Sequence, residues 1–378
     1  MKIIKGEKNE GRIDISLLIL AVILSLWGTV MVFSAGYAYA YARYDDGFYF
    51  IKKQIVWLIL GFIILFGASK IKVSFYQKIT PILYAITLML LLLVLVVGFV
   101  GNGAKRWISI GPITIQPSEI AKITIIMMLA YYFSKYEHLA LSQKKNGDIF
   151  KYGTLLPALI FLIPIILVML QKHLSCIIIL GLIGLSMTVC AGVNLKYISI
   201  FCGMGASGVA MLALFTDYTK ERITVWRNPE GYKLTGGWQT LQGLMAIGSG
   251  GLFGVGLGNS VMKHCYVSEP ANDMIFAILC EETGFCGACA TLLLFALLIY
   301  RGIKISLKAP TVYSRLVAFG ITIKMAIQVL LNVAVVTNTI PNTGISLPFF
   351  SYGGSSLLMI FFEMGILLSI SKSARILK

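Results

Sequence analysis

Long apolar runs separated by short polar segments dominate the chain. A helix needs about 20 mainly apolar residues, at about 1.5 Å of rise per residue, to cross the hydrocarbon of a bilayer. About ten runs approach that length, and we expect them to form the spans Ile15–Phe33, Ile51–Ala68, Pro81–Val100, Glu119–Phe133, Thr154–Gln171, Ser175–Ala191, Lys196–Phe215, Asp273–Tyr300, Tyr313–Val336 and Leu347–Ser371. The pattern predicts an all-α polytopic membrane protein of about ten transmembrane helices, with residues 1–378 forming a single transmembrane domain.

The composition agrees with this class, because the chain is 58% hydrophobic and only 13% charged, whereas soluble domains are about 25% charged. A net charge of +16 would also suit a nucleic-acid binder, but most of the 32 Lys and Arg residues lie in short segments on one side of the predicted topology. Under the positive-inside rule this placement puts both termini in the cytoplasm. We therefore predict a multi-pass plasma-membrane protein that contacts membrane lipids and binds no nucleic acid.

One connection is much longer than the others and comprises residues 216–272, on the predicted extracytoplasmic side. Such long loops are usually functional or disordered. This one contains Trp226, Trp238 and the stretch LQGLMAIGSGGLFGVGLG, so we predict ordered structure that rests on the membrane surface or lies between helices. Its run GLFGVGLG lacks the Lys-Ser/Thr of a phosphate-binding loop, and we interpret it as a turn or a broken helix. Contact between its backbone N–H groups and a phosphate is the alternative.

Several charged residues lie inside the predicted spans, where ionisable groups are candidates for function. Glu119 and Lys122 are three residues apart, share a helix face and can pair. Such a pair either holds two helices together or contacts a substrate. Lys324 and Glu363 are isolated in later spans, where interior pairing or a place in a cavity wall is the simplest interpretation.

The stretch EPANDMIFAILCEETGF contains four acids, of which Asp273, Glu281 and Glu282 lie within one predicted span. Asn272 and Asp273 stand where a helix begins, and both are good N-cap residues. Glu281 and Glu282 lie about 12 Å further along that helix, which is too far for a paired-carboxylate site with Asp273. A cap role would account for Asp273 by itself, but it leaves the basic residues of the outer loops unexplained.

These basic residues suit an anionic ligand at the membrane surface. They are Lys105 and Arg106, directly before Trp107, and in the long loop Arg222, Arg227, Lys233 and Lys263. Arg and Lys bind phosphate groups through charge-assisted hydrogen bonds. Because no soluble-nucleotide motif is present, a lipid phosphate is the natural candidate, with the tail of the ligand lying between helices.

Four stretches carry a resemblance to a known family. They are GAKRWISIGPITIQPSEIAK, ITVWRNPEGYKLTGGWQTLQGLMAIGSGGLFGVGLGNSVMKH, DMIFAILCEETGF and NTIPNTGISLPFFSYGGSSLL. In this order they resemble the SEDS family (shape, elongation, division and sporulation), which includes RodA, FtsW and SpoVE, over nearly the whole chain. One stretch departs from the family, where L-P-E-x-H-x-D is usual and VSEPAND stands here. Glu269 and Asp273 keep their places, while Ala271 replaces the His.

The resemblance implies a peptidoglycan glycosyltransferase, active in cell elongation, division or sporulation. Such an enzyme polymerises lipid II, the undecaprenyl-pyrophosphate-linked disaccharide, on the outer face of the plasma membrane, alongside a class B penicillin-binding transpeptidase. The essential aspartate of the family falls on Asp273, which we expect to act as the general base. The expected substrate-binding residues are Lys105, Arg106, Trp107, Glu119, Lys122, Lys263, Glu269, Ser351 and Ser355. No residue is predicted as a metal ligand, and Mg or Mn is a candidate cofactor.

Two other functions stay open at this point. A lipid II flippase would use Glu119, Lys122, Lys324 and Glu363 to line a path through the membrane, with Asp273 at its periphery. A non-catalytic scaffold that recruits wall-synthesis enzymes would need no single essential acid.

Overall fold

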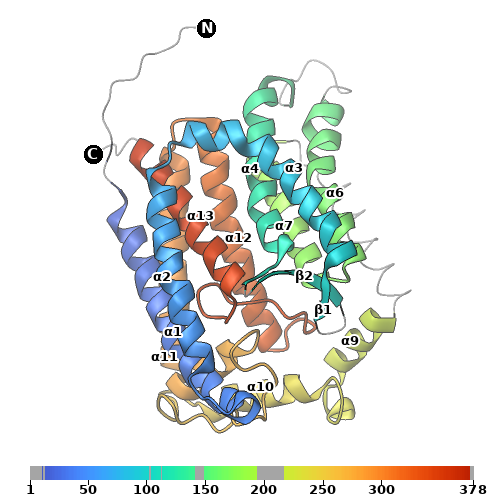
Figure 1. Cartoon of the computed structure of the whole chain (residues 1–378), viewed down its shortest axis with the longest axis vertical. Helices are drawn as coiled ribbons and strands as arrows, with labels where there is room; N and C mark the ends of the chain where they lie inside the picture. Colours follow the sequence, from blue (N-terminus) through green and yellow to red (C-terminus); the bar gives the residue numbers. More distant parts are fainter. Residues whose placement is uncertain are drawn as a thin grey trace.

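The computed structural model describes residue 11 and residues 13–101, 104–111, 113–140, 149–193 and 217–374. Its long helices form an upright bundle (Figure 1), made of α1 (Ile15–Tyr44), α2 (Tyr49–Lys70), α3 (Val73–Val97), α4 (Pro117–Ala140), α6 (Leu156–Leu170), α7 (Leu174–Cys190), α11 (Ile275–Lys308), α12 (Val312–Val336) and α13 (Gly354–Ser373). Within the described residues, seven helices are long and apolar enough to cross a membrane, and α7 is a shorter apolar helix. The predicted class, an all-α polytopic membrane protein, is confirmed.

Several helix boundaries differ from the prediction. Helix α3 begins at Val73 and continues through Pro81, which we expected to be its first residue, because the polar turns before the proline are also helical. Helix α4 reaches Ala140 and is longer than its apolar run. Helix α13 begins at Gly354 and not at Leu347. The predicted span Lys196–Phe215 lies outside the described residues.

The segment before α13 is a turn, for a reason that an apolar run does not reveal. Phe349 has a φ of 65°, in the left-handed region that a helix excludes. The Ser351 hydroxyl accepts a hydrogen bond from the Leu347 N–H at 2.7 Å and donates one to the Asn272 carbonyl at 2.7 Å. These contacts hold residues 347–353 against the segment that precedes α11.

A small antiparallel sheet between α3 and α4 was not predicted. It has the order β1-β2-β3, with β1 (Phe99–Gly101), β2 (Ala104–Ile110) and β3 (Ile113–Ile115). The prediction extended the third apolar span to Val100 and so counted the first strand as helix. Strand β2 carries the basic pair Lys105 and Arg106 and the adjacent Trp107, which were predicted to bind the substrate.

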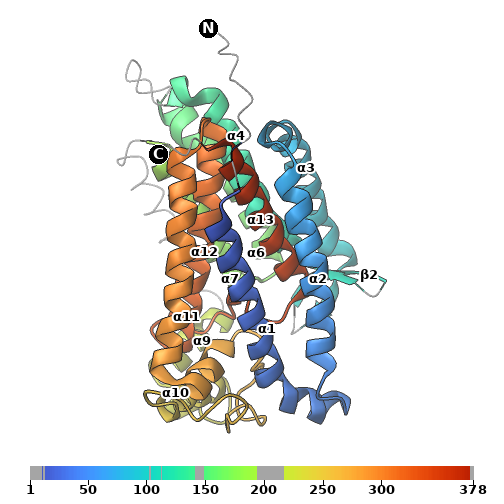
Figure 2. The same cartoon turned by 90° about the vertical axis from the view of Figure 1, so that its left-hand side faces the viewer.

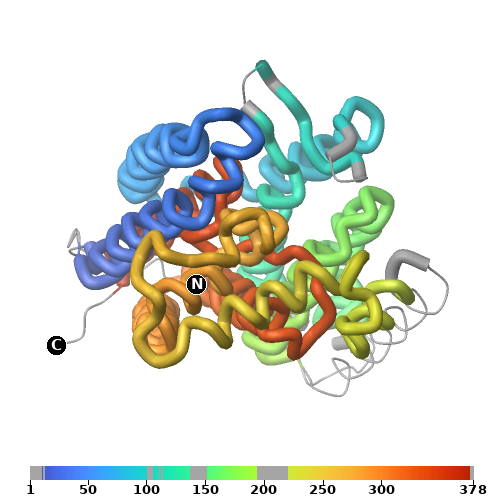
Figure 3. Tube along the Cα trace, turned by 90° about the horizontal axis from the view of Figure 1, so that it is seen from below, coloured from blue at the N-terminus to red at the C-terminus, as the bar shows by residue number. Residues whose placement is uncertain are grey.

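The long loop is ordered where the structure describes it, as predicted. It contains α9 (Asp217–Arg227), the short 3₁₀ helix η2 (Glu230–Tyr232) and α10 (Trp238–Ser249). Seen end-on, residues 217–274 run across the ends of the bundle helices (Figure 3), and the side view places α10 at the same end (Figure 2). We call this the loop end of the bundle.

The described segments nearest the two termini meet at the opposite end of the bundle, as the predicted even number of spans requires. The Gly11 N–H donates to the Lys372 carbonyl at 3.0 Å. Asp14 accepts from the guanidinium of Arg301 at 2.8 Å, and its N–H donates to the Ser371 hydroxyl at 3.1 Å. The assignment of this end to the cytoplasm rests on the distribution of basic residues and stays a prediction.

Candidate functional site

Asp273 lies at the loop end, directly before α11, and α12 holds its backbone carbonyl. The Asn332 side chain, on α12, donates to the Asp273 carbonyl at 2.9 Å and to the Ile345 carbonyl at 2.7 Å. Helix α11 begins at Ile275 without a hydrogen bond from any capping side chain. The interpretation of Asp273 as a helix cap is therefore wrong, and its carboxylate points elsewhere.

The carboxylate faces α10 and the segment before α13. The Gln239 side-chain amide on α10 lies 3.4 Å and 3.5 Å from the two Asp273 carboxylate oxygens. The Gln239 carbonyl oxygen accepts from the Asn342 amide at 3.1 Å, and the Asn342 carbonyl oxygen accepts from the Gly344 N–H at 3.1 Å. This relay sets the orientation of both amides, so that an N–H₂ group and not an oxygen faces Asp273.

The surroundings adjust the acidity of this carboxyl. Burial raises the pKa of Asp273 to about 6, and the negative charge of nearby Glu269 adds to the rise. The Asp273 backbone N–H, Gln239 and the positive charge of Arg222 oppose it. A carboxyl with a pKa near 6 is mostly ionised at neutral pH and still binds a proton readily. These are the properties of a general base.

Glu269 and the two predicted serines surround the same segment. Glu269 has a φ of 53° and accepts a hydrogen bond from the Asn272 amide at 2.5 Å. The Ser351 hydroxyl donates to the carbonyl next to Asp273, as described above. The Ser355 hydroxyl is buried in the first turn of α13 and has no hydrogen-bond partner among the described residues. The structure thus brings Glu269 and Ser351 close to Asp273. Ser355 follows Ser351 by four residues, and no contact joins it to Asp273 among the described residues.

The basic hairpin is joined to the site through the turn between α6 and α7. Arg106 donates from its guanidinium to the Lys172 carbonyl at 2.5 Å, and Lys105 is exposed. Two residues beyond that turn's His173, the Ser175 hydroxyl donates to the Thr343 carbonyl, beside Gly344. Among the described residues, no hydrogen bond or ion pair joins Lys105, Arg106 or Trp107 to Asp273 directly.

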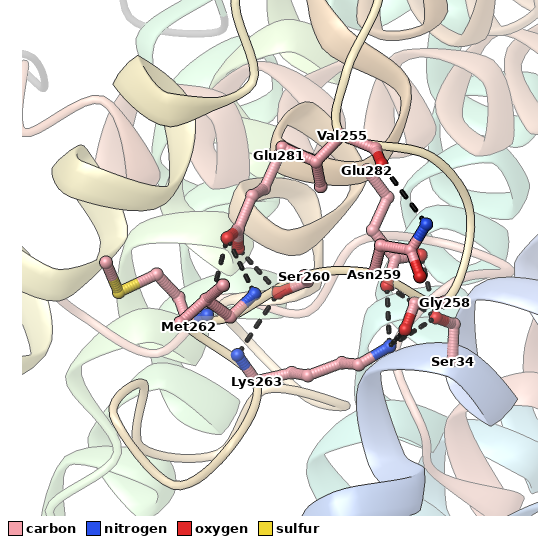
Figure 4. Close-up of polar contacts among 10 residues, drawn as sticks. Ser34, Val255, Gly258, Asn259, Ser260, Met262, Lys263, Glu281 and Glu282 are labelled. Carbon is pink, nitrogen blue, oxygen red and sulfur yellow. Dashed lines mark hydrogen bonds and ion pairs between the residues drawn. The ribbon is translucent and has the colours of Figure 1, made fainter.

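Lys263 is not on the outer surface, where we expected a phosphate ligand to be. It is buried, and its ammonium lies 2.9 Å from Glu282 of α11, 2.6 Å from the Gly258 carbonyl and 3.2 Å from the Ser34 hydroxyl of α1 (Figure 4). Ser34 donates to the Glu282 carboxylate, at 2.6 Å and 2.7 Å from its oxygens. The three N–H donors of the ammonium are therefore all occupied within the protein.

Glu281, the residue before Glu282 on α11, binds the same stretch of the loop. Its carboxylate accepts from the Ser260 hydroxyl at 2.5 Å and from the N–H groups of Val261 and Met262 at 2.9 Å and 3.3 Å (Figure 4). Glu281 and Glu282 together attach residues 258–263 to α11. We call Ser34, Ser260, Lys263, Glu281 and Glu282 the clamp.

The glycine-rich run next to the clamp packs on a break in α11. The helix is interrupted at Gly284, which has a φ of 67°. The N–H groups of Val255 and Gly256 donate to the carbonyls of Glu281 and Glu282, both at 3.0 Å. A Cβ atom at Gly254 would lie 2.2 Å from the Glu282 carbonyl oxygen, so only glycine allows this approach. The turn interpretation is confirmed, and these two N–H groups are not available to a phosphate.

The charged residues of the inner spans form two buried ion pairs. Glu119 and Lys122 are 2.6 Å apart on α4, which confirms the predicted pairing. Lys324 of α12 and Glu363 of α13 are 2.7 Å apart and are almost fully buried, at 1% and 0% exposed. Four charges that neutralise each other within packed helices favour a structural role over a path for a translocated lipid. A substrate contact of Glu119 or Lys122 stays a prediction.

Gln239, Asn332 and Asn342 were missed by sequence reasoning. Gln239 and Asn342 lie in stretches that carry the family resemblance, GGWQT and IPNTG, so a signal was present. As neutral amides, however, they carry no charge that would mark a functional site. Their partners are distant in the chain, and Gln239 and Asn342 are 103 residues apart.

Comparisons with known proteins agree with the resemblance. A family model described as cell cycle protein, for FtsW, RodA and SpoVE, matches residues 14–376. The chain is 40% identical to stage V sporulation protein E of Bacillus subtilis (strain 168), over 96% of this chain and 98% of that protein. It is 36% identical to the probable peptidoglycan glycosyltransferase FtsW of Geobacter sulfurreducens (strain DL-1 / KN400), over 96% of both proteins.

Two solved structures have the same fold. One is a chain from a structure described as the structural coordination of polymerization and crosslinking by a peptidoglycan synthase complex, with a TM-score of 0.77 and 26% identity over 95% of this chain and 97% of that chain. The other is the rod shape determining protein RodA of Thermus thermophilus, with a TM-score of 0.71 and 26% identity over 96% of this chain and 98% of that chain.

Proposed function

The chain belongs to the FtsW, RodA and SpoVE family of cell cycle proteins, and on that premise we propose that it is a peptidoglycan glycosyltransferase with Asp273 as its general base. The observation that carries the proposal is the carboxylate of Asp273 at the loop end, which faces the Gln239 amide, while Asn332 holds the Asp273 backbone carbonyl. Its pKa, raised to about 6, supports proton acceptance near neutral pH. The absence of a side-chain cap hydrogen bond at the start of α11 supports this role over a capping role.

The reaction follows from this group. A sugar hydroxyl of the acceptor gives its proton to Asp273 while its oxygen attacks the anomeric carbon of the donor. The bond between that carbon and the pyrophosphate oxygen breaks, and the lipid pyrophosphate leaves with the electron pair. Direct displacement inverts the configuration and turns an α-linked donor into a β-linked glycan. Positive charge near the leaving group lowers the barrier, and Lys105 and Arg106 are the basic residues that we assign to this role.

The proposed substrate is lipid II, and the proposed partner is a class B penicillin-binding transpeptidase. The relative named as a probable peptidoglycan glycosyltransferase and the neighbour from a peptidoglycan synthase complex support both. The loop end then faces outward, where lipid II is polymerised, and both termini are cytoplasmic. The basic residues at the end of the bundle where the two termini meet, among them Lys70, Lys72 and Arg301, support this orientation.

A divalent cation would reach the site with the substrate. Among the described residues, no group of three or more His, Cys, Asp or Glu side chains could hold a metal ion. Glu269 and Asp273 are two carboxylates near one another, which is too few for a protein-built site of six oxygen ligands. We therefore assign no step to a metal held by this chain, and propose that Mg or Mn, where it takes part, is bound mainly by the pyrophosphate.

The decisive experiment uses the purified full-length protein with labelled lipid II. We expect glycan polymer from the parental protein and none from Asp273→Asn, with both variants folded and at the same concentration. A flippase would move labelled lipid II across proteoliposomes and make no polymer. A scaffold would do neither by itself, so the absence of polymer from the parental protein would contradict the proposal.

A further inference from the structure

A cavity of about 230 Å³ opens between α9 and α10, beside the candidate base. Its lining includes Glu221, Trp226, Gln239, Thr240 and Asn342. Gln239 belongs to both places, because its amide faces the Asp273 carboxylate at 3.4 Å while its side chain forms part of the cavity wall. A molecule in the cavity is therefore separated from Asp273 by one side chain.

The lining combines an aromatic ring with hydrogen-bonding groups. The Trp226 indole N–H donates to the Asn338 carbonyl at 2.9 Å, which fixes the ring in the cavity wall. Among the described residues, neither the Glu221 carboxylate nor the Thr240 hydroxyl has a side-chain hydrogen-bond partner, so both can bind a ligand. An aromatic face suits the apolar C–H face of a sugar ring, and carboxylate, hydroxyl and amide groups suit its hydroxyls.

The size of the cavity restricts the ligand further. Sites for drug-sized molecules are usually about 300–1,000 Å³, and this cavity is smaller. Resting on the glycosyltransferase function proposed above, we propose that the cavity is a saccharide subsite, which holds one sugar ring of the lipid-linked substrate through Glu221 and Thr240. Gln239 then acts as a positioning residue, because the relay from Asn342 holds it between the sugar and Asp273.

The test compares the binding of two ligands to a variant that does not convert the substrate. In the Asp273→Asn background, lipid II and undecaprenyl pyrophosphate, which has no sugar, are titrated into the protein in lipid nanodiscs. We expect the Glu221→Gln, Thr240→Val double variant to bind lipid II about 10-fold more weakly, which corresponds to about 1.4 kcal/mol. Its affinity for undecaprenyl pyrophosphate should stay at the level of the background protein.

Matched controls carry the same substitutions outside the cavity. Thr224→Val on α9 and Glu230→Gln on η2 should leave the affinity for both ligands unchanged, since neither residue lines the cavity. Thr240→Ser keeps the hydroxyl, and this single variant should bind lipid II like the background protein. Thermal melts of every variant separate lost binding from lost folding.

Two results would overturn the subsite. One is lipid II binding at the background level by a double variant that melts normally, and the other is equal weakening for both ligands, since a sugar contact cannot affect a ligand without sugar. Glu221 is exposed, so Glu221→Gln alone should fold if the double variant does not, and it must then weaken lipid II binding by itself. The subsite is tested by ligand binding and the glycosyltransferase function by polymerisation. Failure of the parental protein to make polymer would therefore reject the glycosyltransferase function and not the subsite.

Discussion

Asp273 and the pair Glu281–Glu282 lie within ten residues of each other, yet their carboxylates have opposite surroundings. Glu281 and Glu282 are 1% exposed, and each accepts short hydrogen bonds from the clamp. Asp273 is partly exposed, and its side-chain contacts to Gln239 are long, at 3.4 Å and 3.5 Å. An acid whose oxygens are all satisfied stabilises the fold, whereas an acid with weak partners beside a cavity can accept a proton. The distinction lies in the partners, because all three acids belong to one short stretch.

The largest expected effect is the loss of activity in Asp273→Asn. General bases contribute about 10²- to 10⁴-fold to a rate, so polymerisation of labelled lipid II should fall by at least about 100-fold. The free energy of unfolding should change by less than about 1 kcal/mol, because no strong partner is lost. Thermal melts and gel analysis of the products test both parts. Normal glycan from this variant or from Asp273→Ala, at matched protein levels, would reject the general base.

The clamp should respond in the opposite way. Lys263→Met leaves Glu282 buried without its cation, and removing one partner of a buried pair costs about 3–5 kcal/mol. The exposed pair Lys52–Asp46 is a matched control, since Lys52 is 67% exposed and such pairs contribute about 0–1 kcal/mol. Unfolding in detergent should therefore separate Lys263→Met from Lys52→Met. Equal melting of the two variants would mean that the clamp does not stabilise the fold.

Glu119 provides a fourth acid, which is buried and paired with Lys122 on α4. A double-mutant cycle with Glu119→Gln and Lys122→Met should give a coupling energy of about 1–3 kcal/mol, because the pair is buried at 2.6 Å. In the same four proteins, the polymerisation rate should fall only as far as the amount of folded protein falls. A specific loss of lipid II binding in a stably folded single variant would instead support the substrate-contact interpretation.

The smallest effect is a shift along the pH axis. Because the base must be ionised, kcat/KM should fall about 10-fold between neutral pH and pH 5, along an acid limb with a pKa of about 6. Gln239→Leu removes a donor that lowers the pKa of Asp273, so the limb should move to higher pH. Glu269→Gln removes a negative charge that raises it, so the limb should move to lower pH. If neither substitution moves the pH–rate profile, the acid limb does not report the ionisation of Asp273, and the general-base role is contradicted.

Much of the bundle could be predicted because its helices follow long apolar runs. Helix α12 begins and ends within one residue of the prediction, at Val312 and Val336. The start of α13 was predicted too early, at Leu347, because residues 347–353 continue an apolar run although they include Pro348 and Gly353. A contact of Ser351 with Asn272, 79 residues away in sequence, shapes this turn. The hairpin was hidden for a similar reason, because its first strand continues an apolar run.

The site was predictable only in part. The family resemblance identified Asp273, but position alone favoured a helix cap, and only the structure removed that alternative. Lys263 was misplaced because a charge pattern does not reveal which cations are already paired, and its partner Glu282 lies 19 residues further on. Gln239 depends on an amide more than a hundred residues away, which no local pattern encodes.

The clamp also determines when the loop end can assemble during synthesis. Ser34 and Glu282 are 248 residues apart, and at about 5–20 residues per second a ribosome needs roughly 12–50 s to make the intervening chain. Lys263 precedes Glu282 by only 19 residues, so these two charges can meet as α11 emerges. Helix α1, in contrast, waits in the membrane with only an uncharged hydroxyl at its end of the clamp. A nascent chain that stops before Glu282 has most of its spans but cannot attach residues 258–263 to α11, and the loop end is therefore among the last parts to form.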